Sequence, residues 1–248
     1  VATFLCFSFS EPDAQGDATA EGFITQLGKT ANYFTHPLLA WILGFFIIGF
    51  SLQHIPFEFY QPYLKLLGES SVAGWLSTGS TPLVSGVVFS ISMFGGAIGA
   101  AMSQYLDNRL GLRALLVVSI AIQIIIIAGL SLFLHPLILI LVMLRNFAMS
   151  MARGPMLGAI APHVSSAQRA TFLSLLSLSG RATFSVILAI LSLSVIDADK
   201  SLDWSTLSQV LTTATWVGVS AVAALYFWSR FINSEFARLQ SSLSKENQ

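Results

Sequence analysis

Long runs of apolar residues, separated by short polar breaks, dominate the sequence from residue 36 onwards. A helix that crosses a bilayer needs about 20 mostly apolar residues, and these runs lack the alternating pattern of a barrel strand. The pattern predicts six transmembrane helices, at residues 38–60, 82–105, 112–134, 137–161, 170–195 and 207–232. The expected fold is therefore an all-α membrane protein with a six-transmembrane-helix bundle.

The two ends of the chain follow a different pattern. Residues 1–9 are apolar but too short to span a membrane, and they lack the basic start of a signal peptide. We expect them to be the end of a truncated transmembrane helix in a fragment, because the chain begins with Val. Residues 10–35 are polar and predict an inter-helix loop, residues 36–232 the six-helix domain, and residues 233–248 a polar tail.

Composition agrees with a membrane protein and excludes several function classes. Of 248 residues, 54% are hydrophobic and only 10% are charged, whereas soluble domains are about 25% charged. Net charge is zero and no basic block is present, so no nucleic-acid partner is expected. A single cysteine, four scattered histidines and no phosphate-binding loop give no metal site, no cofactor and no catalytic residues.

Basic residues predict the orientation of the bundle. With six spans, alternate loops share a side, and one side carries Lys29, Arg109, Arg113, Arg169, Arg230, Arg238 and Lys245. The other side has only Lys65 and Lys200 among several acids. Because Lys and Arg favour the cytoplasmic side, the first loop and the tail are expected to be cytoplasmic. The protein is predicted to be a multi-pass protein of the inner or plasma membrane.

Two arginines lie deep inside predicted spans. Arg145 is about 12 Å from the outer start of the fourth span, and Arg181 is about 17 Å from the cytoplasmic start of the fifth. A charge at such depth costs about 3 kcal/mol on insertion scales and usually faces a cavity or a partner. With Gln123 and Ser177, these residues are candidates for a cavity that binds an anionic small molecule. The structural alternative is that each arginine bonds backbone carbonyls or pairs with an acid.

Polar residues accompany these arginines on two helices. The stripe on the fifth span comprises Thr171, Ser174, Ser177, Arg181, Ser185 and Ser192. A second stripe, on the second span, comprises Ser85, Phe89, Ser92, Gly96, Gly99 and Ser103. Small residues allow membrane helices to approach closely, so the second stripe is predicted to be first a packing face and secondarily a cavity wall.

The first span carries an acid near its predicted outer end. Glu58 is a candidate proton-coupling group or outer gate, and the alternative is an interfacial acid within an aromatic belt. Nearby Pro56 and Pro62 are expected to disrupt the helix, and broken helices often mark membrane binding sites. His54 is interpreted as a hydrogen-bonded interface residue rather than a proton relay.

Three stretches resemble the C-terminal half of a bacterial-type major facilitator superfamily transporter. They are GAAMSQYLDNRLGLR (99–113), LRNFAMSMARGPMLG (144–158) and PHVSSAQRATFLSLLSLSGR (162–181). The resemblance implies that the six spans are helices seven to twelve, that residues 1–9 end helix six, and that residues 10–35 are the central cytoplasmic loop. It also implies a missing N-terminal six-helix half as a partner.

The first stretch resembles a loop motif that acts as a cytoplasmic latch in this family. The matching residues are Asp107, Arg109, Gly111 and Arg113, although extra residues separate the acid from the basic residues. Read structurally, the same residues are a positively charged turn on the cytoplasmic side.

The family resemblance and the composition together predict a secondary active transporter, not an enzyme. It would move small solutes across the lipid bilayer by alternating access. Two alternatives stay open: a polytopic membrane enzyme acting on a lipid-like substrate, and a non-transporting membrane scaffold or receptor.

Overall fold

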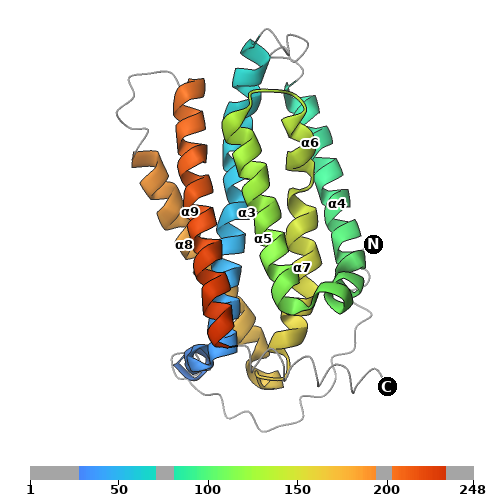
Figure 1. Cartoon of the computed structure of the whole chain (residues 1–248), viewed down its shortest axis with the longest axis vertical. Coiled ribbons are helices and arrows are strands. Elements are labelled where there is room, and N and C mark those ends of the chain that lie inside the picture. The colour runs from blue at the N-terminus through green and yellow to red at the C-terminus, as the bar shows by residue number, and fades with distance from the viewer. Residues whose placement is uncertain (1–27, 71–80, 194–202, 233–248) are drawn as a thin grey trace, which may run out of the picture.

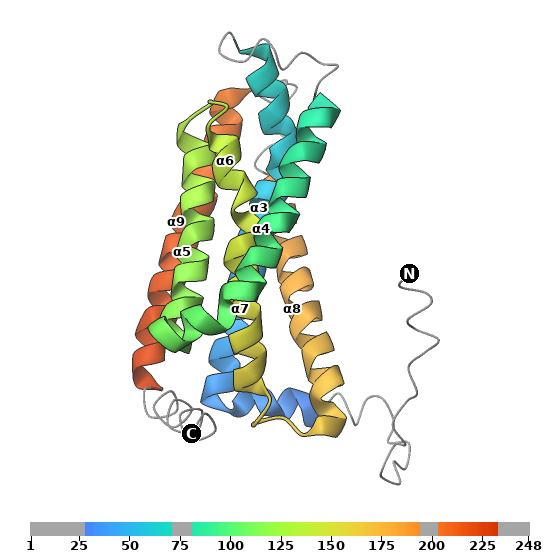
Figure 2. The same ribbon diagram turned by 90° about the vertical axis from the view of Figure 1, so that its right-hand side faces the viewer.

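The computed structural model describes residues 28–70, 81–193 and 203–232. Within them lie η1 (Asn32–Thr35), α3 (Pro37–Glu69), α4 (Thr81–Leu110), α5 (Leu112–Leu132), α6 (Ile138–Met143), α7 (Arg145–Ile160), α8 (Ser166–Leu193) and α9 (Trp204–Phe231). The long helices run side by side in an elongated bundle (Figures 1 and 2). The described residues contain no strand. The predictions for residues 1–9, 10–27 and 233–248 lie outside the described residues.

In the described part of the chain, five helices are long and apolar enough to cross a membrane: α3, α4, α5, α8 and α9. The fourth predicted span is divided into α6, of 6 residues, and α7, of 16 residues. Each is too short to span alone, but the two together with Leu144 would cover about 35 Å at 1.5 Å per residue. The prediction of an all-α membrane bundle is confirmed, and the fourth span differs from expectation by an interruption at Leu144.

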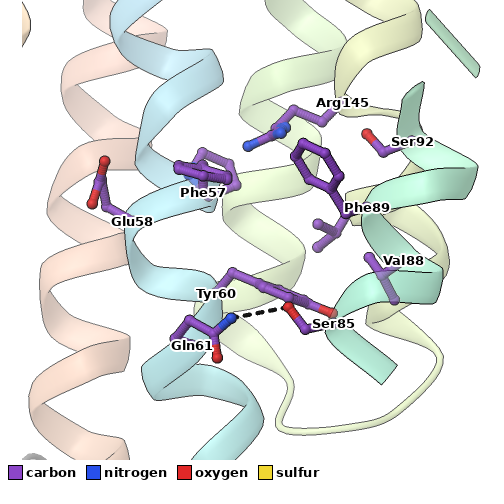
Figure 3. Close-up of a pocket in the computed structure, with 11 residues that line it drawn as sticks. Phe57, Glu58, Tyr60, Gln61, Ser85, Val88, Phe89, Ser92 and Arg145 are labelled. Carbon is purple, nitrogen blue, oxygen red and sulfur yellow. Dashed lines mark hydrogen bonds between the residues drawn. The ribbon is translucent and has the colours of Figure 1, made fainter. Parts of the chain in front are cut away.

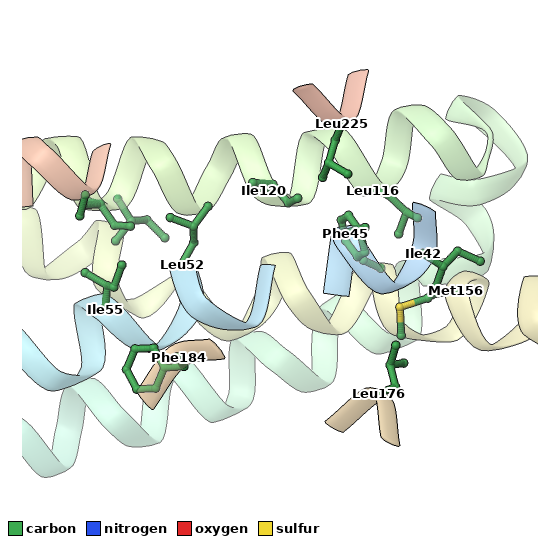
Figure 4. Close-up of a cluster of buried hydrophobic side chains, with 14 of the residues drawn as sticks. Ile42, Phe45, Leu52, Ile55, Leu116, Ile120, Met156, Leu176, Phe184 and Leu225 are labelled. Carbon is green, nitrogen blue, oxygen red and sulfur yellow. The ribbon is translucent and has the colours of Figure 1, made fainter. Parts of the chain in front are cut away.

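Helix α3 lies at the centre of the bundle, and its buried residues face several neighbours. Figure 4 shows Phe45 of α3 next to Leu116 of α5 and Leu225 of α9, with other α3 side chains near α7 and α8. The indole Nε1 of Trp41 donates a 2.9 Å hydrogen bond to the carbonyl oxygen of Leu225. A helix that is apolar on most faces can be buried on most faces, which explains why α3 occupies the middle.

Helices α4 and α7 pack closely through the predicted small-residue face. A Cβ added at Gly99 would lie 2.5 Å from the carbonyl oxygen of Phe147, and one at Gly96 would lie 3.3 Å from the Cβ of Asn146. Only glycine lets the two backbones approach to this distance. The prediction that this stripe of the second span packs against another helix is confirmed, with α7 as its partner.

Two local predictions were wrong. Helix α3 continues through Pro56 and Pro62 to Glu69 instead of breaking there. The predicted loop after the second span is a single residue, Gly111, because α4 runs to Leu110 and α5 begins at Leu112. Gly111 has φ 75° and ψ 155°, a region that is essentially restricted to glycine, and this turn lets the chain reverse without a longer loop.

Candidate functional site

A recess of about 190 Å³ opens between α3, α4 and the α6–α7 pair. It lies toward the end of the bundle where α3 finishes and α4 begins. The side chains that shape it include Phe57 and Tyr60 from α3, Ser85, Phe89 and Ser92 from α4, and Arg145 from α7. Figure 3 shows Phe57, Phe89 and Arg145 reaching into the space between α3 and α4.

Arg145 is the buried charged residue that lines this recess. Only 7% of its surface is exposed, and its guanidinium carbon lies 4.9 Å from the centroid of the Phe57 ring. Within the described part of the chain, its Nε has no hydrogen-bond partner and no carboxylate forms an ion pair with it. A buried charge without a partner is unfavourable, so this guanidinium is left with donors available to an incoming acceptor.

A second polar group in the recess is also without a partner. The Oγ of Ser92, in a residue only 2% exposed, makes no hydrogen bond to the described residues. Nearby, the Nε2 of Gln61 donates a 2.9 Å hydrogen bond to the Oγ of Ser85 (Figure 3). The Oη of Tyr60, which also lines the recess, has no hydrogen-bond partner among the described residues either. Buried polar groups in proteins are normally hydrogen-bonded, and three unpartnered groups in one recess are typical of a binding site.

The helix interruption at Leu144 places Arg145. The amide of Leu144 bonds the carbonyl of Leu141 at 3.0 Å, which tightens the last turn of α6 before α7 starts at Arg145. Tight turns within a helical span often mark a functional hinge. The break is thus located next to the buried charge, and not at the prolines of α3.

Gln123 supports Arg145 from behind. Its Nε2 donates a 2.7 Å hydrogen bond from α5 to the carbonyl oxygen of Arg145, and its Oε1 has no partner among the described residues. Gln123 is absent from the lining of the recess. Its hydrogen bond holds the start of α7 in position, and its predicted role in lining a cavity stays a prediction.

A further polar link joins α3, α7 and α4 next to Arg145. The Nε2 of Gln53 donates a 3.1 Å hydrogen bond to the Oδ1 of Asn146, and the Nδ2 of Asn146 lies 3.7 Å from the Sδ of Met93. Asn146 is only 8% exposed. Polar bonds between membrane helices stabilise their association, so this link fixes the three helices that surround the recess.

The other predicted cavity residues lie elsewhere. Arg181 of α8 is exposed in this chain, and Ser177 is half-buried. No described contact joins Arg181 to Arg145, and their joint role in one cavity stays a prediction. Gly180, beside Arg181, faces Phe46 and Phe50 of α3. The side chain of Ser192 lies outside the described residues.

Glu58 borders the recess but is exposed. Figure 3 shows its carboxylate on the opposite side of α3 from Arg145. Its role in coupling or gating stays a prediction. The Nδ1 of His54 donates a 2.8 Å hydrogen bond to the carbonyl oxygen of Phe50, and the His54 ring stacks on that of Phe50.

The residues of the predicted latch surround the α4–α5 turn. Asp107 is half-buried, and its carbonyl oxygen accepts a 2.8 Å hydrogen bond from the amide of Gly111. The guanidinium of Arg109 lies 4.8 Å from the centroid of the Tyr105 ring, and that of Arg113 lies 5.9 Å from that of Tyr226 on α9. Their latch function stays a prediction.

Sequence reasoning missed the residues that complete the recess. The sequence pattern assigns Ser92 first to a packing face and gives no separate role to Phe57 and Tyr60. The available signal was the four-and-three spacing of Ser85, Phe89 and Ser92, which places them on one face of α4. That face splits along its length: its first half lines the recess and its second half packs against α7.

These features define an integral, multi-pass, all-α membrane protein with a mostly apolar recess between its helices that contains the buried Arg145. No protein-family model and no curated protein sequence matches the chain. Among solved structures, the fold is similar to that of a mutant of the nucleoside transporter NupG, with a TM-score of 0.62 and 16% identity. The match covers 90% of this chain and 57% of the NupG chain. At this identity the likeness shows the fold alone.

Proposed function

We propose that this chain is the C-terminal half, helices seven to twelve, of a major facilitator superfamily transporter. The whole protein moves small solutes across the plasma membrane by alternating access, and it is not an enzyme. The transporter-type fold supports this proposal, as does a match that covers 57% of the NupG chain.

The observation that carries the proposal is Arg145. Its guanidinium is buried, it has no ion-pair partner in the described residues, and it lies beside a helix break in a recess. A purely structural arginine would be expected to have its donors satisfied by backbone carbonyls or an acid. The unsatisfied Nε of Arg145 therefore favours a role for this side chain in binding the transported solute.

Solute uptake tests this function. The natural-length protein is reconstituted into liposomes, and accumulation of a panel of small solutes is measured with and without a proton gradient. We expect uptake to fall at least about tenfold in Arg145→Ala and to fall in Arg181→Ala as well. Uptake should persist in the matched control Arg153→Ala, which removes an exposed arginine two turns further along α7. A protein that binds solutes but never moves them across the membrane would favour a scaffold or receptor. Unchanged uptake in both Arg145→Ala and Arg181→Ala would exclude the assignment of these two arginines to a solute-binding cavity.

A further inference from the structure

The charge balance of the recess limits its ligand. Arg145 contributes one positive charge. Among the described residues the only acid that borders the recess is Glu58, which is exposed and points to the other side of α3 (Figure 3). A buried charge is tolerated when a ligand of opposite charge neutralises it. One guanidinium balances one negative charge, so a dianion would carry an excess charge into a region of low polarity.

The free hydrogen-bond donors limit the anionic group. The guanidinium of Arg145 is a planar fork of N–H donors, and such a fork matches two oxygens of a carboxylate. Ser92, from the facing helix α4, adds a hydroxyl without a partner in the described part of the chain. The two groups are each more than nine-tenths buried. Together they suit a carboxylate, whereas a phosphate monoester brings close to two negative charges at neutral pH.

The remaining walls limit the body of the ligand. Phe57 and Phe89 are 45% and 46% exposed, and their ring centroids lie 6.5 Å apart with the rings inclined at 50°. Val88 and Val142 add apolar surface. Aromatic rings pack favourably at centroid separations of about 4.5–7 Å. A volume of about 190 Å³ is below the roughly 300–1,000 Å³ of sites for drug-sized ligands, so the body must be small.

We propose that this recess binds a small monocarboxylate with a compact apolar body, preferably one aromatic ring. The carboxylate lies between Arg145 and Ser92, and the ring lies against Phe57 and Phe89. This assignment rests on the proposed transport function, because it names the substrate class of the same site.

Direct binding tests the assignment separately from transport. The purified natural-length protein is titrated calorimetrically with four probes: benzoate, benzamide, terephthalate and acetate. Benzamide removes the charge, terephthalate adds a second one, and acetate removes the ring. We expect benzoate to bind at least about tenfold more tightly than each of the other three, because each lacks one feature that the recess recognises or adds one that it cannot balance.

Three variants locate the binding. Arg145→Gln is expected to weaken benzoate binding at least about tenfold and to abolish the preference over benzamide. Ser92→Ala removes one oxygen and leaves packing nearly unchanged. It is expected to weaken benzoate binding about threefold to tenfold. This variant keeps the test valid if Arg145→Gln fails to fold. Arg153→Gln is the control and should bind benzoate like the parent protein.

The outcomes separate the two proposals. Benzoate binding that depends on Arg145 and Ser92, without uptake, supports this assignment and contradicts transport. Uptake of other solutes, together with equal affinity for benzoate and benzamide, overturns the assignment and leaves transport standing. Tighter binding of terephthalate or acetate than of benzoate also overturns it.

Discussion

The side-chain amide of Gln123 on α5 donates a 2.7 Å hydrogen bond to the backbone carbonyl oxygen of Arg145, the first residue of α7. This bond joins two helices at the point where the fourth span is interrupted. It holds the backbone that presents the buried guanidinium to the recess, so Gln123 acts on the site through the position of Arg145.

Replacing Gln123 tests this positioning role. Gln123→Leu keeps the side-chain volume and removes the donor, so we expect a loss of about 0.5–1.5 kcal/mol in the free energy of unfolding. Benzoate affinity should fall while the preference over benzamide persists, since Arg145 itself is intact. The control Ser119→Ala lies one turn away on α5, and its hydroxyl bonds the carbonyl of Leu116 in its own helix. Equal affinity in Gln123→Leu and the parent protein would contradict the role.

Close packing of α4 on α7 makes Gly99 intolerant of a side chain. In Gly99→Ala the new Cβ meets the carbonyl oxygen of Phe147 at 2.5 Å, so the helices must separate, at a cost of about 1–3 kcal/mol. Thermal unfolding in detergent measures the loss. Gly158→Ala is the matched control on α7, because no atom lies within 4 Å of its added Cβ. If the Gly99→Ala protein were as stable as the control, α4 and α7 would have to lie further apart than the 2.5 Å contact implies.

The hydrogen bond between Gln53 and Asn146 should couple α3 to α7. A double-mutant cycle with Gln53→Leu and Asn146→Leu is expected to give a coupling energy of about 0.6 kcal/mol, with an upper bound near 1.7 kcal/mol, as for other polar pairs between membrane helices. Unfolding equilibria of the four proteins in mixed micelles provide the measurement. Strictly additive effects would mean that the 3.1 Å contact contributes nothing to stability.

The turn between α4 and α5 depends on Gly111. Its φ of 75° and ψ of 155° exclude residues with a Cβ, so Gly111→Ala should destabilise the protein by about 1–3 kcal/mol. The neighbouring Leu110→Ala, which leaves the turn conformation unchanged, controls for a general effect of substitution at this end of the bundle. A smaller loss in Gly111→Ala than in Leu110→Ala would contradict this account.

Asp203 caps the start of α9 and predicts a pH dependence. Its Oδ1 accepts a 2.9 Å hydrogen bond from the amide of Thr206, and its Oδ2 accepts one from the hydroxyl of Ser205. These bonds, chiefly those from Thr206, lower the pKa of Asp203 from 3.8 to about 2. A carboxyl whose pKa is lower in the folded state stabilises above its unfolded pKa, and this contribution is lost as pH falls toward the folded pKa.

The measurement compares unfolding midpoints of the parent protein and Asp203→Ala. The difference between them should be constant above about pH 5 and should close as pH falls from about 4 to 2. Asp203→Asn retains a capping oxygen without a titrating group, so its midpoint relative to Asp203→Ala should not change over that range. A constant difference between the parent and Asp203→Ala down to pH 2 would exclude the charged cap.

The positions of the helices could be predicted from the sequence, because the length of an apolar run is a local property. Predicted spans and observed helices agree closely for α5 and α9, and they differ mainly where helices extend into polar residues, as α3 does to Glu69. The interruption of the fourth span could not be predicted. Leu144 is neither proline nor glycine, and the prolines that suggested a break, Pro56 and Pro62, are accommodated within α3.

The site was predictable only in part. Arg145 and Gln123 could be identified as candidates from their depth in the predicted spans alone, because a charged or polar side chain within an apolar run usually faces a cavity or a partner. Their different roles depend on packing: Arg145 faces the recess, and Gln123 bonds its carbonyl. Phe57 and Ser92 join the site only because α3 and α4 lie side by side around α7.

The sequence by itself determined that this is an all-α membrane protein, because the number and length of apolar runs decide how often a chain can cross a bilayer. It also identified two arginines at membrane depth, which were equivalent by that criterion. Only the tertiary structure distinguished them. Arg145 is buried between α3, α4 and α7, and its Nε has no hydrogen-bond partner among the described residues, whereas Arg181 is exposed, next to the glycine of α8 that packs on α3. Burial depends on which helices become neighbours, and no local pattern encodes that.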